Sequence, residues 1–196
     1  MRTSTRQGEG GRAGQAPPAS RRETWFDTPY GVGRLGFSGD VPLELDLPEP
    51  GRTRPEGTDE GHLSDRQREW VARVERYFAG EPVSFDLDVR AHCRARGFTA
   101  FETDVYAALA QVPYGHAVSY RDLAHAAGRP NAYRAVGTAM SHNALPVILP
   151  CHRVIKNDGR PGLYGEDPTW KTRLLELEGT LRRGATKVVM TGRGQR

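Results

Sequence analysis

The segment NALPVILPCHRV, residues 143–154, carries the most information about this chain of 196 residues. An apolar run closed by proline at both ends leads directly to Cys151, which is followed by His152 and Arg153. A thiol is a nucleophile only as the thiolate, and nearby imidazole and cationic groups lower its pKa. On an extended segment adjacent side chains point to opposite faces, so we expect a water molecule to connect His152 with the sulfur. The Cys-His pair alone fits an ordinary buried cysteine equally well.

Two short helices are predicted just before this segment. Ser119 is a good N-cap for a helix over residues 120–127, and Gly-Arg-Pro at 128–130 predicts a tight connection. Asn131 is a good cap for a second helix, over residues 132–143. Two short helices joined by a glycine-containing turn outline a helix-turn-helix, a motif of DNA-binding proteins.

Alternating apolar residues predict a strand-rich N-terminal part. Short runs broken by Gly and Pro predict strands between residues 25 and 47. Ser64 and Gln67 form a capping box, which predicts an amphipathic helix that ends at Gly80. Apolar residues alternate again over residues 85–89 and predict one more strand.

A second capping box, at Thr99 and Glu102, predicts an amphipathic helix that ends near Pro113 and opens a helical part of the chain. Strands followed by helices predict an α+β fold. The expected boundaries are a disordered basic arm at 1–22, an N-terminal α+β domain at 23–89, a helical DNA-binding domain at 90–179 and a basic tail at 180–196.

Charge is distributed unevenly along the sequence. Residues 23–89 contain seven Arg and fifteen Asp and Glu, whereas residues 90–196 contain sixteen Lys and Arg and eight Asp and Glu. A basic C-terminal half suggests a polyanionic partner for that half, although these charges fit a solvated surface equally well.

Composition also narrows the class of protein. The mean hydropathy is -0.64, and the longest apolar run, around residues 147–149, is too short to cross a bilayer, so we expect no membrane association. Two cysteines without an apolar export signal predict a cytoplasmic protein rather than a disulfide framework.

The segment PCHRV at 150–154, preceded by the predicted helix-turn-helix, resembles the active site of the O6-alkylguanine-DNA alkyltransferases, the methylated-DNA–protein-cysteine methyltransferases. The resemblance is close from residue 98 to 179 and weaker from 25 to 89. It implies DNA repair by stoichiometric transfer of an alkyl group from O6-alkylguanine in duplex DNA to a cysteine. It implies a single-turnover methyltransferase, which would need no soluble cofactor; we assign no metal ligands and expect a monomer.

The resemblance also implies roles for single residues. Cys151 would accept the alkyl group, His152 would take its proton through a water molecule, and Glu178 would orient the histidine. The residues implied in contacts with DNA are Arg134, which would fill the space of the extruded nucleotide, Tyr120 at its 3′ phosphate, and the small Ala135 and Gly137 in the minor groove. Met140 and Tyr164 would wall the guanine pocket, and Asn143 would brace the turn between the second helix and the active site.

Two stretches depart from the family pattern. The family usually has Asn-Pro after the second helix, whereas Asn143-Ala144-Leu145-Pro146 places the proline two positions later. The loop at 162–167, GLYGED, contains two acidic residues, which leaves open which alkyl groups fit. Relatives without catalytic activity carry Trp in place of Cys151, so the thiol argues against that subclass.

Three other interpretations stay open at this point. A helix-turn-helix regulator would explain the basic half but not the Pro-Cys-His-Arg segment. A cysteine hydrolase lacks an evident oxyanion motif. His92-Cys93 and Cys151-His152 form a possible zinc set, but neither pair has the usual ligand spacing.

Overall fold

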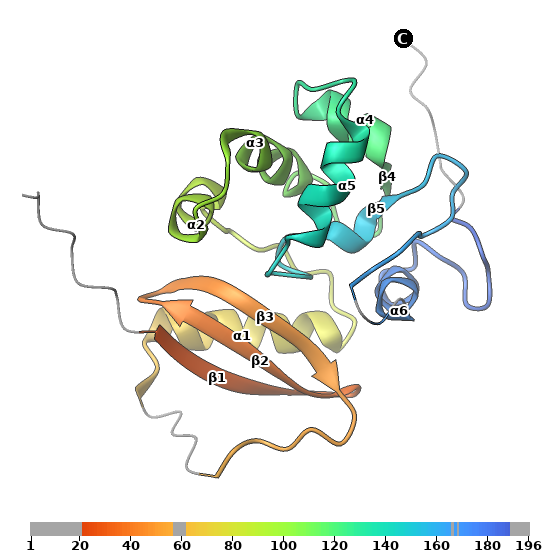
Figure 1. Ribbon diagram of the computed structural model, residues 1–196. Helices are drawn as coiled ribbons and strands as arrows, with labels where there is room; N and C mark the ends of the chain where they lie inside the picture. Colours follow the sequence, from red (N-terminus) through yellow and green to blue (C-terminus); the bar gives the residue numbers. More distant parts are fainter. Residues whose placement is uncertain (1–20, 57–61, 166, 168, 189–196) are drawn as a thin grey trace, which may run out of the picture.

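The computed structural model describes residues 21–56, 62–165, 167 and 169–188. It begins with an antiparallel sheet in the order β1 (Arg21–Thr28), β2 (Gly31–Ser38) and β3 (Val41–Glu49). Helix α1 (Asp65–Phe78) lies across one face of this sheet (Figure 1). The rest is mainly helical: α2 (Val89–Arg96), α3 (Ala100–Leu109), α4 (Tyr120–Ala126), α5 (Tyr133–Ser141) and α6 (Thr169–Leu177). The α+β prediction is confirmed.

Several local predictions are confirmed as well. Both capping boxes form: the Ser64 side chain accepts from the backbone N–H of Gln67 at the start of α1, and Thr99 accepts from Glu102 at the start of α3. Ser119 caps α4. The helices α4 and α5 pack against each other as the predicted helix-turn-helix. Of the predicted basic arm and tail, residues 1–20 and 189–196 lie outside the described residues, and Arg21 and Arg22 already belong to β1.

The strand predicted over residues 85–89 is wrong. Residues 81–88 form neither helix nor strand, and Val89 begins α2, which Asp88 caps through the backbone N–H of Ala91. The Phe85 ring stacks on Trp70 of α1, with 6.1 Å between ring centroids. The apolar alternation therefore reflects packing on a helix rather than pairing with a strand.

The cap predicted at Asn131 is also wrong. Helix α5 begins at Tyr133 after Ala132, and no side chain among the described residues caps it. The backbone N–H of Ala132 donates to the carbonyl of Arg129 at 2.9 Å, and this turn keeps Asn131 one position away from the cap.

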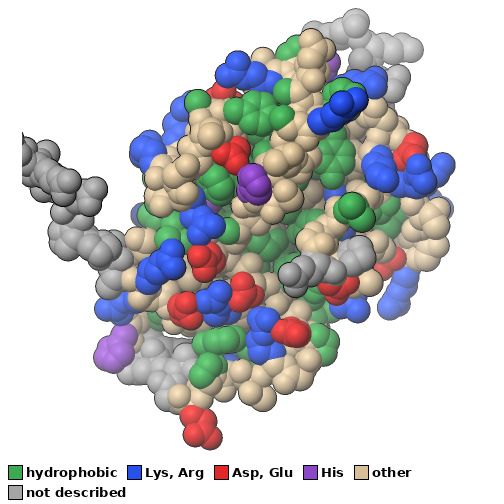
Figure 2. Space-filling view, in the orientation of Figure 1, with side chains coloured by type: hydrophobic (Ala, Val, Ile, Leu, Met, Phe, Trp, Pro, Cys, Tyr) green, Lys and Arg blue, Asp and Glu red, His purple; other side chains and the backbone are tan. Residues whose placement is uncertain are grey.

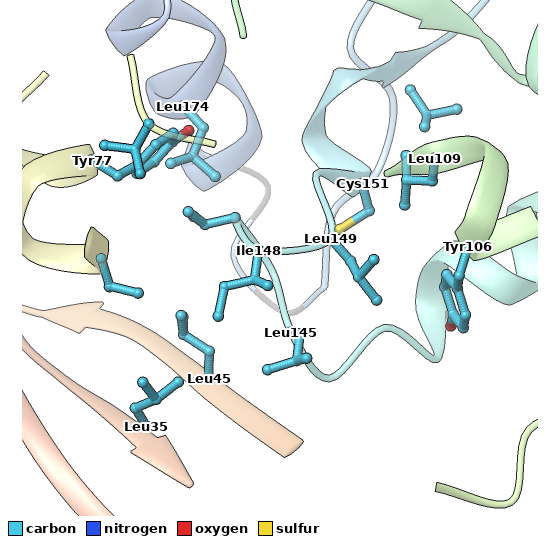
Figure 3. Close-up of a cluster of buried hydrophobic side chains, with 14 of the residues drawn as sticks. Leu35, Leu45, Tyr77, Tyr106, Leu109, Leu145, Ile148, Leu149, Cys151 and Leu174 are labelled. Atoms are coloured by element: carbon cyan, nitrogen blue, oxygen red, sulfur yellow. The ribbon is translucent and has the colours of Figure 1, made fainter. Parts of the chain in front are cut away.

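The sheet and the helical part share one hydrophobic core. The segment 145–149 passes between Leu35 and Leu45 of the sheet and Tyr106 and Leu109 of α3 (Figure 3). Polar contacts join the same two parts: the Leu45 N–H donates to the Ala144 carbonyl at 2.8 Å, and Arg96 pairs with Glu44 at 3.0 Å. The sheet therefore packs directly against the segment that leads to Cys151.

The opposite face of the sheet is polar. Basic and acidic side chains alternate over it (Figure 2). Arg34 forms ion pairs with Glu23 at 2.5 Å, with Asp46 at 2.8 Å and with Glu44 at 3.6 Å. Among the described residues, no helix has both the length and the apolar character that a bilayer-spanning segment needs.

Two glycines of β2 provide a matched test of the sheet. A Cβ at Gly33 would lie 2.2 Å from the Phe26 ring and 2.9 Å from the Asp46 carbonyl oxygen, whereas at Gly36 the nearest atom would be 3.6 Å away. We expect Gly33→Ala to lower the free energy of unfolding by about 1–3 kcal/mol through overpacking. Gly36→Ala should change it by less than about 1 kcal/mol. Urea unfolding of the two variants checks this, and equal stabilities would contradict the strand packing.

Candidate active site

Two consecutive tight turns deliver Cys151 to its position. The Ile148 N–H donates to the Pro146 carbonyl at 2.9 Å across Val147, and the Cys151 N–H donates to the Leu149 carbonyl at 2.7 Å. Val147 has φ 74, a conformation that β-branched residues rarely adopt and that costs about 1–3 kcal/mol. The structure corrects one expectation here: Cys151–Arg153 is a short 3-10 helix, η2, and not an extended segment.

The sulfur of Cys151 is held in a nearly closed environment. The residue is 5% exposed, Sγ accepts a hydrogen bond from Asn143 Nδ2 at 3.0 Å, and the thiol donates to the Tyr164 hydroxyl at 3.6 Å. Burial raises the pKa of the thiol, whereas the bonds to Asn143 and Tyr164 and the charge of Lys171 act in the opposite direction. The site therefore protects the thiol from bulk solvent and still supports a thiolate.

Asn143 connects the end of α5 to the cysteine. Its Nδ2 also donates to the Leu149 carbonyl at 2.8 Å, and its Oδ1 accepts from the Leu145 N–H at 3.0 Å. One side chain thus bonds to the turn before Cys151 at two backbone positions and to the sulfur itself.

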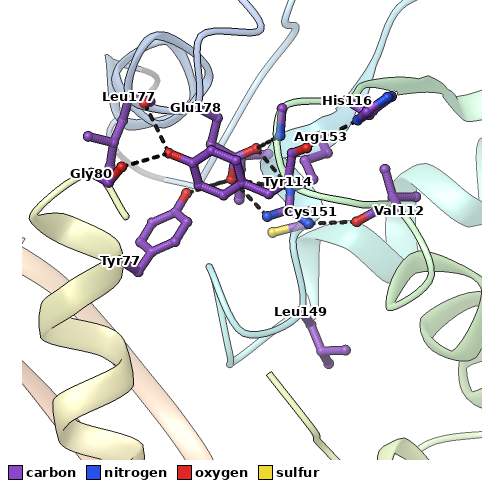
Figure 4. A network of polar contacts seen from close by, with 12 residues as sticks. Tyr77, Gly80, Val112, Tyr114, His116, Leu149, Cys151, Arg153, Leu177 and Glu178 are labelled. Carbon is purple, nitrogen blue, oxygen red and sulfur yellow. Dashed lines mark hydrogen bonds and ion pairs between the residues drawn. The ribbon is translucent and has the colours of Figure 1, made fainter. Parts of the chain in front are cut away.

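A buried carboxylate lies behind the cysteine. Glu178 Oε1 accepts from the Tyr77 hydroxyl at 2.8 Å and from Arg153 Nη2 at 2.9 Å (Figure 4). The same oxygen accepts from His152 Nε2 at 2.7 Å. Its Oε2 accepts from Arg153 Nε at 3.0 Å and from the backbone N–H of Gly115 at 3.1 Å. Burial alone would raise the pKa of Glu178, but the bonds from His152 and Arg153 lower it to about 2. Glu178 is therefore an anion at neutral pH.

This carboxylate determines which nitrogen of His152 carries the proton. An ionised carboxylate only accepts hydrogen bonds, so Nε2 must be the donor. Nδ1 then has a free lone pair, and it is buried without a hydrogen-bond partner among the described residues. Burial lowers the pKa of His152 and Glu178 opposes that shift. The ring is therefore a neutral base that can be stabilised once it is protonated.

A cavity of about 750 Å³ opens in front of the sulfur, a volume typical of ligand sites. Seven of the ten predicted site residues line it: Tyr120, Arg134, Gly137, Met140, Asn143, Cys151 and Tyr164. His152 and Glu178 lie behind the cysteine, and Ala135 is exposed on α5 outside the lining. The structure thus brings most of the predicted residues to one place, and their individual roles stay predictions.

The mouth of the cavity is both cationic and apolar. Arg134 is exposed, and its guanidinium lies 5.9 Å from the centroid of the Tyr133 ring. Tyr133 and Leu163 also line the cavity and are 44% and 87% exposed. Of the two acidic residues in the departing loop, Asp167 accepts from the Thr169 N–H at 2.8 Å at the start of α6, and Glu166 lies outside the described residues.

Three further side chains of the site were not predicted from the sequence. Lys171 is 1% exposed, its Nζ donates to the Tyr120 hydroxyl at 3.4 Å, and burial lowers its pKa to about 8. Arg153 appears in the sequence only as a neighbour of the cysteine, and Tyr77 falls within the amphipathic helix predicted to end at Gly80. The one available signal was the position of Lys171, three and four residues before the apolar Leu174 and Leu175; nothing local indicates the partners of Tyr77.

The two Cys-His pairs do not form a metal site. Across the described ranges, no group of three or more His, Cys, Asp and Glu side chains could hold a metal ion. His92 Nδ1 instead donates to the Pro42 carbonyl at 3.1 Å, which joins α2 to β3.

Comparisons with known proteins agree with this geometry. Residues 100–180 match the family model described as 6-O-methylguanine DNA methyltransferase, DNA binding domain. A methylated-DNA–protein-cysteine methyltransferase of Mycobacterium tuberculosis is 39% identical over 157 residues, which cover 78% of this chain and 89% of the relative. The constitutive enzyme of Bacillus subtilis is 42% identical over 107 residues, 54% of this chain and 62% of the relative.

A solved structure extends the likeness to both parts of the fold. The crystal structure of Mycobacterium tuberculosis OGT in complex with DNA matches this fold with a TM-score of 0.63 and 34% sequence identity. The match covers 80% of this chain and 92% of the chain in that structure. Because both the sequence and the architecture match over about nine tenths of the length of the Mycobacterium tuberculosis protein, the chain belongs to the methylated-DNA–protein-cysteine methyltransferase family.

Proposed function

We propose that Cys151 Sγ accepts the alkyl group in a single-turnover repair of O6-alkylguanine in duplex DNA. The observation that supports this best is the position of the sulfur, which faces a cavity of about 750 Å³ and has a buried histidine and carboxylate behind it. A regulator that only binds DNA has no use for this arrangement.

The transfer is a displacement at carbon. The thiol proton passes through a water molecule to Nδ1 of His152, and Glu178 stabilises the imidazolium that forms. The thiolate attacks the alkyl carbon, a carbon–sulfur bond forms, and the bond from that carbon to O6 of guanine breaks. The electron pair stays on the guanine, which takes up a proton. Water does not readily cleave the thioether, so one molecule repairs one lesion.

The tyrosine beside the sulfur suits the leaving group. Burial and the nearby Cys151 raise the pKa of Tyr164 well above its ordinary value, so its hydroxyl remains a donor throughout the neutral range. Because this hydroxyl lies 3.6 Å from Sγ, it is placed to donate to O6 as negative charge develops there.

The helix-turn-helix provides the face for the duplex. A Cβ at Gly137 would meet no described atom within 4 Å outside its own helix, and the nearby Ala135 is exposed, so α5 can approach the minor groove closely. Arg134, exposed at the first turn of α5, would fill the space of the extruded nucleotide and offset part of a cost of a few kcal/mol. Tyr120 would contact the 3′ phosphate.

The remaining proposals rest on the sequence. We place the activity in the cytoplasm, because both cysteines are free thiols, as is usual in a reducing compartment. The protein would act as a monomer without a soluble cofactor. The strand-rich part, residues 23–89, and the helical part, residues 90–179, would be its two domains.

The first test is the fate of the alkyl group. Incubation with duplex DNA containing O6-methylguanine should add one methyl group per protein molecule at Cys151 and leave unmodified guanine. Cys151→Ala should remove no methyl group, whereas Cys93→Ala, at the other buried thiol, should behave as wild type. Intact mass and peptide mapping measure this. Repair of many equivalents by one protein molecule would show a hydrolase or demethylase instead.

A second test separates base extrusion from ordinary phosphate binding. Arg134→Ala should slow transfer from saturating duplex at least about tenfold, because an arginine that stabilises the flipped state acts on the rate rather than on affinity. Transfer from free O6-benzylguanine should change much less. Arg66→Ala, which removes an equal charge from an exposed position on α1, is the control. A wild-type rate for Arg134→Ala at saturation would rule out this role.

A third test concerns the cation near the thiol. Because Lys171 has a pKa of about 8, it is charged below that pH and favours the Cys151 thiolate. Iodoacetamide should therefore modify Cys151 faster in the wild type than in Lys171→Met below pH 8, and the ratio of the rates should fall toward one as pH rises through 8. Peptide mass spectrometry follows Cys151 separately from Cys93. A ratio of one at every pH would contradict this effect.

A further inference from the structure

The strand-rich half contributes one polar group to the site behind Cys151. Tyr77, near the end of α1, is fully buried, and its hydroxyl donates to Glu178 Oε1 at 2.8 Å and lies 3.3 Å from His152 Nε2. The two bonded residues are 101 positions apart in sequence. The hydroxyl therefore joins the first helix of the chain to the carboxylate that supports the histidine (Figure 4).

The surroundings of Tyr77 fix the direction of this hydroxyl. Its ring meets Phe78 edge-on at 5.4 Å and Tyr114 at 6.0 Å between centroids, and Phe85 lies at 6.3 Å. A phenylalanine would satisfy these apolar contacts equally well. Packing alone therefore does not explain the hydroxyl. Its two polar neighbours are His152, which would take the thiol proton, and Glu178, which would stabilise the imidazolium.

We infer that Tyr77 is a positioning residue for alkyl transfer, whose hydroxyl holds the Glu178 carboxylate on Nε2 of His152 so that Nδ1 remains the base. This inference rests on the function proposed above. Burial and the charge of Glu178 raise the pKa of Tyr77 well above its ordinary value, so the hydroxyl stays protonated and donates at every pH at which the protein works.

The hydroxyl also limits how strongly the carboxylate supports an imidazolium. Glu178 Oε1 accepts hydrogen bonds from Tyr77, His152 and Arg153. Removal of the Tyr77 donor therefore leaves more negative charge on Oε1, next to Nε2 of the histidine. The other charged groups that act on the ring, Arg153 and Lys171, oppose its protonation. Without the Tyr77 hydroxyl, the pKa of His152 should therefore rise, and the carboxylate should lose one of the contacts that fix its orientation.

The test is Tyr77→Phe, measured as the single-turnover rate with free O6-benzylguanine from pH 5 to pH 9. Loss of a hydrogen bond to a buried charge should slow transfer about tenfold at the plateau. The acid limb of the profile should move to higher pH, because His152 becomes protonated earlier. Affinity for duplex DNA should stay unchanged, since Tyr77 lies behind the cysteine and does not line the cavity.

Tyr106→Phe is the matched control. Tyr106 is also fully buried, but its hydroxyl donates to the Ala139 carbonyl at 2.7 Å, away from Glu178. Both variants should lower the melting temperature, and only Tyr77→Phe should change the rate and the pH profile. If the two variants share the wild-type profile and plateau, Tyr77 is merely structural and the inference is wrong.

A second variant covers the case in which Tyr77→Phe does not fold. Replacement of Tyr77 by 3-fluorotyrosine keeps the ring and the hydroxyl and makes the hydroxyl a stronger donor, so the acid limb should move to lower pH. An unchanged profile would also overturn the inference. Failure of the proposed function is a separate outcome, because wild-type protein would then leave Cys151 unmodified in every assay.

Discussion

The buried carboxylate of Glu178 is the charge on which the rest of the site depends. Burying an anion costs several kcal/mol unless a countercharge and hydrogen bonds compensate it. Here Arg153 supplies the countercharge, and Tyr77, His152 and the Gly115 backbone supply the remaining donors. These partners come from α1, from the loop after α3 and from η2, so the carboxylate can be satisfied only when all of these segments are in place.

This dependence explains why a thiol can react inside a nearly closed environment. Burial disfavours the Cys151 thiolate and would disfavour a charged His152 as well. The anion at Glu178 stabilises a charged His152. Asn143 and Lys171 offset part of the rise that burial causes in the pKa of the Cys151 thiol. The electrostatic environment of the short Cys-His-Arg sequence therefore depends on residues outside it, from Asn143 to Glu178.

Sequence reasoning succeeded where the partners of an interaction are close in sequence. The capping boxes at Ser64 and Thr99 have both members within three residues, and the fold class followed from the order of such local signals. The strand expected at 85–89 failed because an apolar alternation does not show whether a helix or a strand will cover it. The bond from Tyr77 to Glu178 was beyond reach, since an apolar helix face gives no sign of a carboxylate that follows 101 residues later.

Asn143 links the proposed alkyl acceptor to the helix before it. Its amide bonds to Sγ and to the backbone before Cys151, just after the end of α5. A thioether is a poorer acceptor than a thiolate, so alkylation of Cys151 would weaken the bond from Asn143 Nδ2 to Sγ. The same amide bonds to the turn that follows α5, so alkylation of Cys151 would also change the link between that helix and the cysteine. On the proposed function, a spent molecule would differ from a fresh one in its hydrogen bonding as well as in its mass.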